Sequence, residues 1–167
     1  MESRAKLFGH SIHQMLIVFP LGLLAMAVIF DILSKIANTT RWTEMAFYMI
    51  GAGLVTGLIA AVFGLIDFLA IPPGTRAKGI GLIHGFGNVV VILLFAASWL
   101  LRWPDPAIPG TLAYVCSYAG VALALITGWL GGELVDRLGV GVDEGANLDA
   151  PSSLTTRHVH GAHMHRA

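Results

Sequence analysis

The sequence GLIDFLAIPPGTRAKGIGLIHGFGN, residues 64–88, predicts a tight turn between two membrane helices. Its centre, residues 72–74, reads Pro-Pro-Gly, and these residue types are typical of turns. Asp67 lies near the end of the outgoing apolar arm, and His84 lies near the start of the returning arm. An ionisable residue inside a membrane span is costly and is by default a candidate for function. We therefore expect a site beside this turn.

The composition indicates a membrane protein with one domain. Of the 167 residues, 56% are hydrophobic and 12% are charged, whereas about a quarter are charged in an ordinary soluble domain. The formal net charge is zero, so nothing points to nucleic acid as a partner. The single cysteine, Cys116, excludes a disulfide within the chain and a cysteine-based metal site. The first apolar run lacks a small-residue cleavage site, so we expect a retained helix there.

Four apolar runs are each long enough to cross a membrane. A spanning helix needs about 20 residues to cross about 30 Å of hydrocarbon. The expected spans are residues 12–36, 44–70, 79–102 and 111–136. Short connections force consecutive helices to be antiparallel neighbours. The predicted fold is an all-α integral membrane protein, a four-transmembrane-helix up-down-up-down bundle in contact with the lipid bilayer.

The sequence also predicts how the chain is divided and oriented. Residues 1–142 would form the transmembrane domain, and residues 143–167 a flexible, histidine-rich cytoplasmic tail. Lys and Arg residues are enriched on the inner side of a membrane. One face of the expected bundle carries seven of them, Arg4, Lys6, Arg76, Lys78, Arg137, Arg157 and Arg166, and the other carries Lys35, Arg41 and Arg102. Both termini are therefore expected inside.

Small residues spaced four apart mark helix faces that can approach closely in lipid. They are Gly53, Gly57, Gly81, Gly85, Gly120, Ala124, Gly128 and Gly132. We expect these faces to hold the bundle together or to form a homo-oligomer.

Titratable side chains gather at the inner ends of the expected helices. They are His10, His13, Asp67, His84, Glu133 and Asp136. The outer half offers only Asp31, Lys35, Glu44 and Arg102, all near span ends where we expect them to reach water. This one-sidedness predicts a polar site in the inner leaflet, for which three interpretations stay open.

The first interpretation is a haem b site. His13 and His84 would be the axial ligands, because haem iron accepts paired imidazoles and helices one and three lie diagonally in such a bundle. Asp67 could orient one imidazole, and Arg76 and Lys78 could meet the propionates. No second histidine pair lies toward the outer face, so electrons would pass to a redox partner or quinone on the inner side only.

Two further residues belong to this expected site. His10 lies three residues before His13 and would share its face on a helix, so either histidine could serve. Asn88 lies on the same arm as His84.

The second interpretation is a metal-ion- or proton-handling membrane protein, with a divalent transition-metal site or an ion pathway that uses His13, Asp67, His84 and Glu133. Mixed imidazole and carboxylate ligation suits zinc, manganese or iron. The third is a packing or interaction subunit without a ligand, in which Asp67 pairs with Arg76 and Glu133 with Arg137.

The end of the chain holds a weak candidate of its own. A histidine-rich tract can chelate a transition metal, and the tail carries His158, His160, His163 and His165.

Several segments together resemble the bacterial membrane protein family DUF2231. They are GHSIHQMLIVFPLGL from Gly9, Phe30 with Asp31, FGLIDF from Phe63, Ile71 with Pro72, residues 84–88, Arg102, GGELV from Gly131 and GVGV from Gly139. The resemblance covers roughly residues 9–142 and implies four membrane helices in a bacterial inner membrane. Some relatives are joined to Rieske-type iron–sulfur domains, which implies an electron-transfer setting.

This chain departs from the family pattern at its beginning. Family members usually have a His-Pro-x-His-Pro element followed by Phe-Pro, often with another histidine before the Phe-Pro pair. Here Ser11 and Gln14 replace the two prolines, and Val18 replaces that histidine. No nucleophile–base pair or phosphate loop is found, so we do not expect an enzyme. The leading expectation is a haem-binding redox component.

Overall fold

A computed structural model describes residues 1–155 of the chain. The first membrane helix is built from α1 (Ile12–Leu16) and α2 (Val18–Ala37), which meet at Ile17. Pro20 explains the interruption, because proline has no N–H to donate to the carbonyl of Leu16 one turn earlier. The backbone stays helical through Ile17, whose N–H donates to the His13 carbonyl over 3.0 Å.

The other three spans are single long helices. They are α3 (Arg41–Ala70), α4 (Arg76–Arg102) and α5 (Thr111–Gly132), and a short π-helix, η1 (Glu133–Arg137), continues α5. All four are long and apolar enough to cross a membrane, with mean hydropathy between 1.6 and 2.6. The prediction of an all-α bundle with four membrane spans is confirmed.

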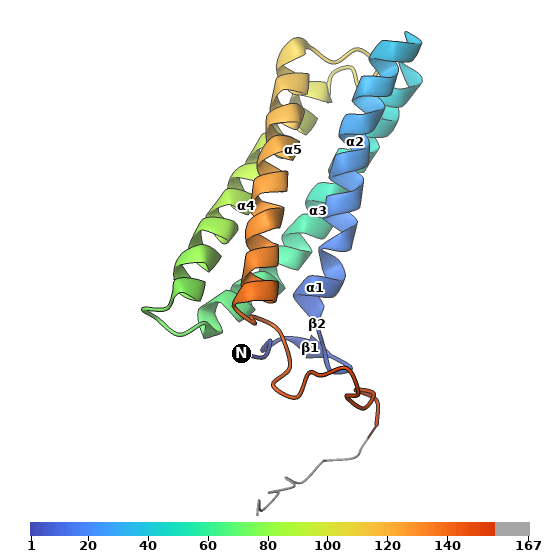
Figure 1. Ribbon diagram of the computed structural model, residues 1–167. Coiled ribbons are helices and arrows are strands. Elements are labelled where there is room, and N and C mark those ends of the chain that lie inside the picture. Colours follow the sequence, from blue (N-terminus) through green and yellow to red (C-terminus); the bar gives the residue numbers. More distant parts are fainter. Residues whose placement is uncertain (156–167) are drawn as a thin grey trace, which may run out of the picture.

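The helices stand side by side in an up-down-up-down bundle (Figure 1). Around the bundle, α2 packs against α3 and α5, and α4 packs against α5 and α3, so α2 and α4 are diagonal. A hairpin of β1 (Lys6–Leu7) and β2 (His10–Ser11) precedes α1. This hairpin, the turn at residues 71–75 and η1 lie at one end of the bundle, here called the terminal end; the connections at residues 38–40 and 103–110 lie at the far end.

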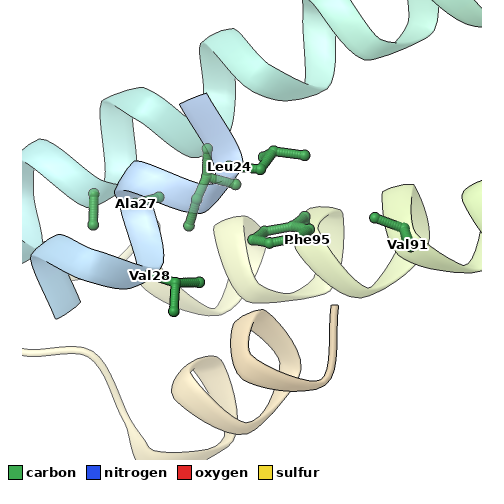
Figure 2. Packing of buried hydrophobic residues seen from close by; sticks show 7 residues of the cluster. Leu24, Ala27, Val28, Val91 and Phe95 are labelled. Atoms are coloured by element: carbon green, nitrogen blue, oxygen red, sulfur yellow. The ribbon is translucent and has the colours of Figure 1, made fainter. Parts of the chain in front are cut away.

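The buried apolar core lies between the helices in the half of the bundle nearer the far end. Figure 2 shows this cluster, which consists of Leu24, Ala27, Val28, Ala46, Ile50, Val91 and Phe95. Two small residues let the helices close on it: a Cβ added to Gly53 would lie 2.6 Å from Leu24, and one added to Gly120 would lie 2.8 Å from Phe95. The helix faces at Gly53 and Gly120 therefore pack against other helices of the same chain. Much of the remaining apolar surface is left outward for lipid.

The contacts made by the first two spans recur in the last two. His84 and Arg102 stand 71 residues after His13 and Asp31, and Gly120 and Gly131 stand 67 residues after Gly53 and Gly64. The close contacts at these glycines are repeated as well. Gly53 contacts Leu24, and Gly120 contacts Phe95, which lies 71 residues after Leu24. In the same way, Gly64 contacts His13 and Gly131 contacts His84. At these offsets identical residues also recur, including Ala46 and Ala113, both fully buried. The bundle therefore consists of two equivalent helical hairpins.

Candidate functional site

His13 is hydrogen-bonded to the backbone of α3. It lies on α1, and its Nδ1 is 2.8 Å from the backbone carbonyl oxygen of Ala60 on α3. A carbonyl oxygen can only accept, so Nδ1 carries the proton. A Cβ added to Gly64 would lie 2.8 Å from Cε1 of the ring, so glycine is what lets the imidazole lie there. The other nitrogen, Nε2, has no hydrogen-bond partner within residues 1–155.

His84 repeats this arrangement in the second hairpin. Its Nδ1 lies 2.9 Å from the backbone carbonyl oxygen of Thr127 on α5 and must likewise donate. A Cβ added to Gly131 would lie 3.1 Å from its Cε1. The two half-buried histidines therefore have the same tautomer and the same kind of partner, at equivalent positions of the two hairpins.

Asn88 holds His84 in place. Its Nδ2 donates to the backbone carbonyl of His84 over 2.9 Å and lies 3.3 Å from the ring Nε2. Its Oδ1 accepts a hydrogen bond of 3.1 Å from the Thr127 hydroxyl. Asn88 was expected at the site, and it lies beside the imidazole, bridging α4 and α5.

This donor set suits a group that takes two neutral imidazoles. A histidine whose Nδ1–H is bound to a carbonyl presents the lone pair of Nε2, which is the usual state of a metal-ligating histidine. The glycines at positions 64 and 131 open the space in which the two rings lie. Two neutral imidazoles of this tautomer are a ligand pair that haem iron accepts.

Asp67 has a different role from the one expected. Its buried carboxylate accepts hydrogen bonds of 2.8 Å from the Ser3 hydroxyl and 2.7 Å from the Arg4 backbone N–H, with the Ala5 N–H at 3.4 Å. The expectation that Asp67 pairs with Arg76 is wrong. A chain segment that precedes the first helix reaches this carboxylate and takes up its lone pairs, and nothing in residues 64–88 could indicate that.

Glu133 is also paired differently. Its carboxylate lies 2.6 Å from the Arg76 guanidinium, so the pair joins the start of α4 to η1, and the expected partner Arg137 is not used. Lys78 donates to the Phe68 backbone carbonyl over 2.7 Å, and its ammonium lies 4.0 Å from the Phe68 ring centroid. Lys78 therefore braces the turn at residues 71–75, whereas Arg76 links α4 to η1.

His10 does not lie on a helix. It belongs to strand β2, its side chain is exposed, and its Nδ1 lies 3.2 Å from the Phe8 carbonyl oxygen. The shared helical face that we expected for His10 and His13 is absent, because the first helix begins only at Ile12. Of the two, His13 is the histidine that reaches the bundle.

The four side chains of the metal interpretation do not converge. Within residues 1–155 no group of three or more His, Cys, Asp or Glu side chains is arranged to hold a metal ion. Asp67 and Glu133 are each occupied by other partners. The tail candidates His158, His160, His163 and His165 lie outside the described residues.

A second polar cluster was missed by the sequence reasoning. Asp31 and Arg102 were expected to reach water, but both are fully buried and form a two-pronged ion pair with N–O distances of 2.8 and 2.6 Å. Ser98 and Ser117 complete it: the Ser98 hydroxyl accepts from Arg102 Nε over 3.2 Å, and that of Ser117 lies 3.4 Å from both partners. The 71-residue offset that also links the two histidines was the signal that could have related these positions.

The position of the Asp31–Arg102 ion pair shows where the approximate two-fold axis of the bundle lies. Asp31 and Arg102 occupy equivalent positions on the diagonal helices α2 and α4 and contact each other. The approximate two-fold axis that relates the hairpins therefore passes between them. His13 and His84 are related by the same axis. Each histidine lies 18 residues before its ion-pair residue, Asp31 or Arg102, which corresponds to about 27 Å along the span at 1.5 Å per residue.

The segments before α1 and after η1 are tied together at the terminal end. Lys6 contacts Glu2 over 2.6 Å and Asp143, the first residue of the expected tail, over 2.9 Å. The hydrogen bond to Glu2, and then that to Asp143, raises the pKa of Lys6. The hydrogen bond from Lys6 in turn lowers the pKa of Asp143. The Gly141 N–H also donates to the Met1 carbonyl over 2.9 Å.

The model of a family described as predicted membrane protein, DUF2231, matches residues 9–144. No curated protein and no solved structure matched the chain.

Proposed function

This chain belongs to the DUF2231 family of predicted membrane proteins, and from that premise we propose that it is a haem b-binding redox component of a bacterial inner membrane. One observation supports the proposal: His13 and His84 stand at equivalent positions of the two hairpins, each with its Nδ1–H donated to a backbone carbonyl. Two imidazoles fixed in this tautomer would hold the iron of a bound haem.

The protein's part in this function is to hold the ligands. The Ala60 and Thr127 carbonyls fix the two rings and, in the neutral imidazole, place the proton on Nδ1, so that Nε2 is the nitrogen with the lone pair. Asn88 would have to turn its amide away from Nε2 of His84 while the Thr127 hydroxyl still anchors its oxygen. Haem, when bound, supplies one-electron transfer, and burial in the bundle sets the local polarity that tunes its potential.

The proposal includes an orientation. The terminal end carries Arg4, Lys6, Arg76, Lys78 and Arg137, whereas the far end carries Lys35 and Arg41 besides the buried Arg102. Because Lys and Arg near span ends favour the cytoplasm, the terminal end and both termini would face inward. A redox partner or a quinone would then exchange electrons on that side. A homo-oligomer would have to use open small residues such as Gly85 and Gly128, which have no atom within 4 Å of an added Cβ.

The test is an absorption spectrum of the detergent-purified protein from haem-replete cells, recorded air-oxidised and dithionite-reduced. We expect a Soret band that shifts on reduction and is lost or strongly weakened in His13→Ala and His84→Ala. His10→Ala is the matched control, since this exposed histidine lies at the same end but outside the bundle. It should retain the spectrum, as should a chain that lacks residues 150–167.

Two results would contradict the proposal. A colourless wild-type protein would exclude haem and leave metal analysis as the next measurement. A coloured protein whose spectrum survives both alanine substitutions would place the haem elsewhere.

A further inference from the structure

The hairpin of β1 and β2 carries exposed apolar side chains at its tip. Leu7 is 46% exposed and Phe8 is 71% exposed, although both lie outside the membrane helices. We propose that this tip inserts into the boundary between headgroups and acyl chains of the lipid leaflet at the terminal end. The partner is the lipid of the surrounding bilayer, and the contact anchors the segment before α1 to the membrane.

The backbone of Phe8 is the first indication that its side chain has a partner. The strand register leaves two residues, Phe8 and Gly9, in the turn between β1 and β2. Both have a positive φ, 50° and 85°, as in a type I′ turn, which strongly prefers Asn-Gly. A phenylalanine with its Cβ is strained in this conformation. Such strain persists where a side chain is used for a contact, and Phe8 is mostly exposed within its own chain.

The two faces of the hairpin differ in what covers them. Side chains alternate between faces along a strand, so the cross-strand pair Lys6 and Ser11 lies opposite to the pair Leu7 and His10. Ser11 is buried and Lys6 contacts the Asp143 carboxylate, so the first face packs against the protein. Leu7 and His10 are both exposed. The face that continues into the apolar tip is therefore the one left open.

The hairpin lies at the depth of the lipid headgroups. The segment that leads into it is bound by Asp67, whose carboxylate accepts from the Ser3 hydroxyl over 2.8 Å. Asp67 precedes the end of α3 at Ala70 by three residues, or about 4.5 Å along the helix. The Ile12 N–H donates to the Ala5 carbonyl over 2.9 Å, so the hairpin is joined directly to the start of α1, and it lies just below that helix in Figure 1. The ends of spanning helices mark the edge of the hydrocarbon layer.

The surface next to the tip selects lipid as the partner. The first span exposes Met15, Val18 and Phe19 within a few residues of the hairpin, and these side chains face the bilayer in a membrane-spanning helix. Phenylalanine and leucine are also residues that interfacial segments bury at the boundary between headgroups and acyl chains. Lipid therefore fits the tip better than a water-soluble protein does, because the same bilayer already covers the adjoining surface.

The first test places a fluorescent reporter at the tip of the full-length protein in lipid nanodiscs. Phe8→Trp keeps a large apolar ring, and its emission is taken as the difference from the wild type, which has four tryptophans. We expect quenching by lipids brominated on their acyl chains and protection from acrylamide in the water. Leu148→Trp is the matched control, because Leu148 is fully exposed in the segment after η1. Its added tryptophan should be quenched by acrylamide and not by the brominated lipids.

The second test separates anchoring from turn formation. Phe8→Asn introduces the residue that this turn prefers, so relief of strain alone would slow amide hydrogen exchange in the hairpin. Loss of a lipid contact has the opposite effect, and we expect residues 1–11 to exchange about tenfold faster in nanodiscs, as for one lost apolar side-chain burial. His10→Asn changes an exposed polar residue of the same hairpin and should exchange like the wild type.

Three results would overturn the proposal. Quenching of the Phe8→Trp signal by acrylamide alone would place the tip in water. Protection from both quenchers would place it against protein, either a second copy of the chain or another segment. Exchange in Phe8→Asn that is unchanged or slower would show that lipid does not hold the hairpin. None of these results depends on whether the protein binds haem.

Discussion

Replacing Asp31 by leucine should unfold this protein more readily than any other single change at the far end. The substitution leaves the Arg102 guanidinium fully buried without its two hydrogen-bonded oxygens, which now lie 2.8 and 2.6 Å away. Removing one partner of a buried ion pair costs about 3–5 kcal/mol, because the remaining charge is neither hydrated nor paired. Ser98 and Ser117 cannot replace a carboxylate, since a hydroxyl carries no charge.

The reciprocal change should cost less. In Arg102→Met the Asp31 carboxyl can take up a proton and become neutral, whereas a guanidinium cannot lose one. We expect about 3 kcal/mol for Arg102→Met and the upper end of the range for Asp31→Leu. The double variant leaves no buried charge, so it should be nearer to the wild type than either single variant.

The assay is reversible unfolding in mixed micelles of sodium dodecyl sulfate and a neutral detergent, followed by circular dichroism. Arg41→Met is the control, because Arg41 is an exposed arginine at the same end. Single losses below about 1 kcal/mol, typical of exposed ion pairs, or additive losses in the double variant would refute the burial of this pair.

Three further predictions concern other parts of the bundle. Asp67→Asn removes the charged acceptor that binds the N-terminal segment, so that segment should lose about 1–3 kcal/mol of local stability and exchange its amide hydrogens faster by mass spectrometry. Gly120→Ala places a methyl group 2.8 Å from buried Phe95 and should cost about 1–3 kcal/mol, whereas Gly128→Ala meets no atom within 4 Å and should be neutral in the same unfolding assay. The contact of Lys6 with Asp143 should stabilise the terminal end above the usual pKa of a carboxyl and lose that effect as the pH falls through the lowered pKa of Asp143. It should also be lost as the pH rises through the raised pKa of Lys6; in Lys6→Gln an NMR titration of Asp143 should return its pKa to the ordinary range.

The candidate site was only partly predictable. His84 and Asn88 lie one helical turn apart on α4 and do meet, because their spacing alone places them together. Asp67 and Arg76 lie on the two sides of the turn and do not pair, because each has a partner from a distant segment, Ser3 and Glu133 respectively. Local spacing predicts contacts within one helix, but it does not reveal competition from other parts of the chain.

The sequence by itself determined that this is a membrane protein with four spans, because uninterrupted apolar runs of that length have no other stable environment and short connections leave only antiparallel neighbours. It also contained the duplication, in offsets of 71 and 67 residues between equivalent positions. Only the tertiary structure decided which charges are buried: Asp31 and Arg102 lie 71 residues apart near span ends, where water is within reach of a long side chain. Both side chains turn inward because the two hairpins pack around a common axis, which brings equivalent positions face to face. At that axis the Asp31 carboxylate accepts two hydrogen bonds from the Arg102 guanidinium, and the two charges neutralise each other.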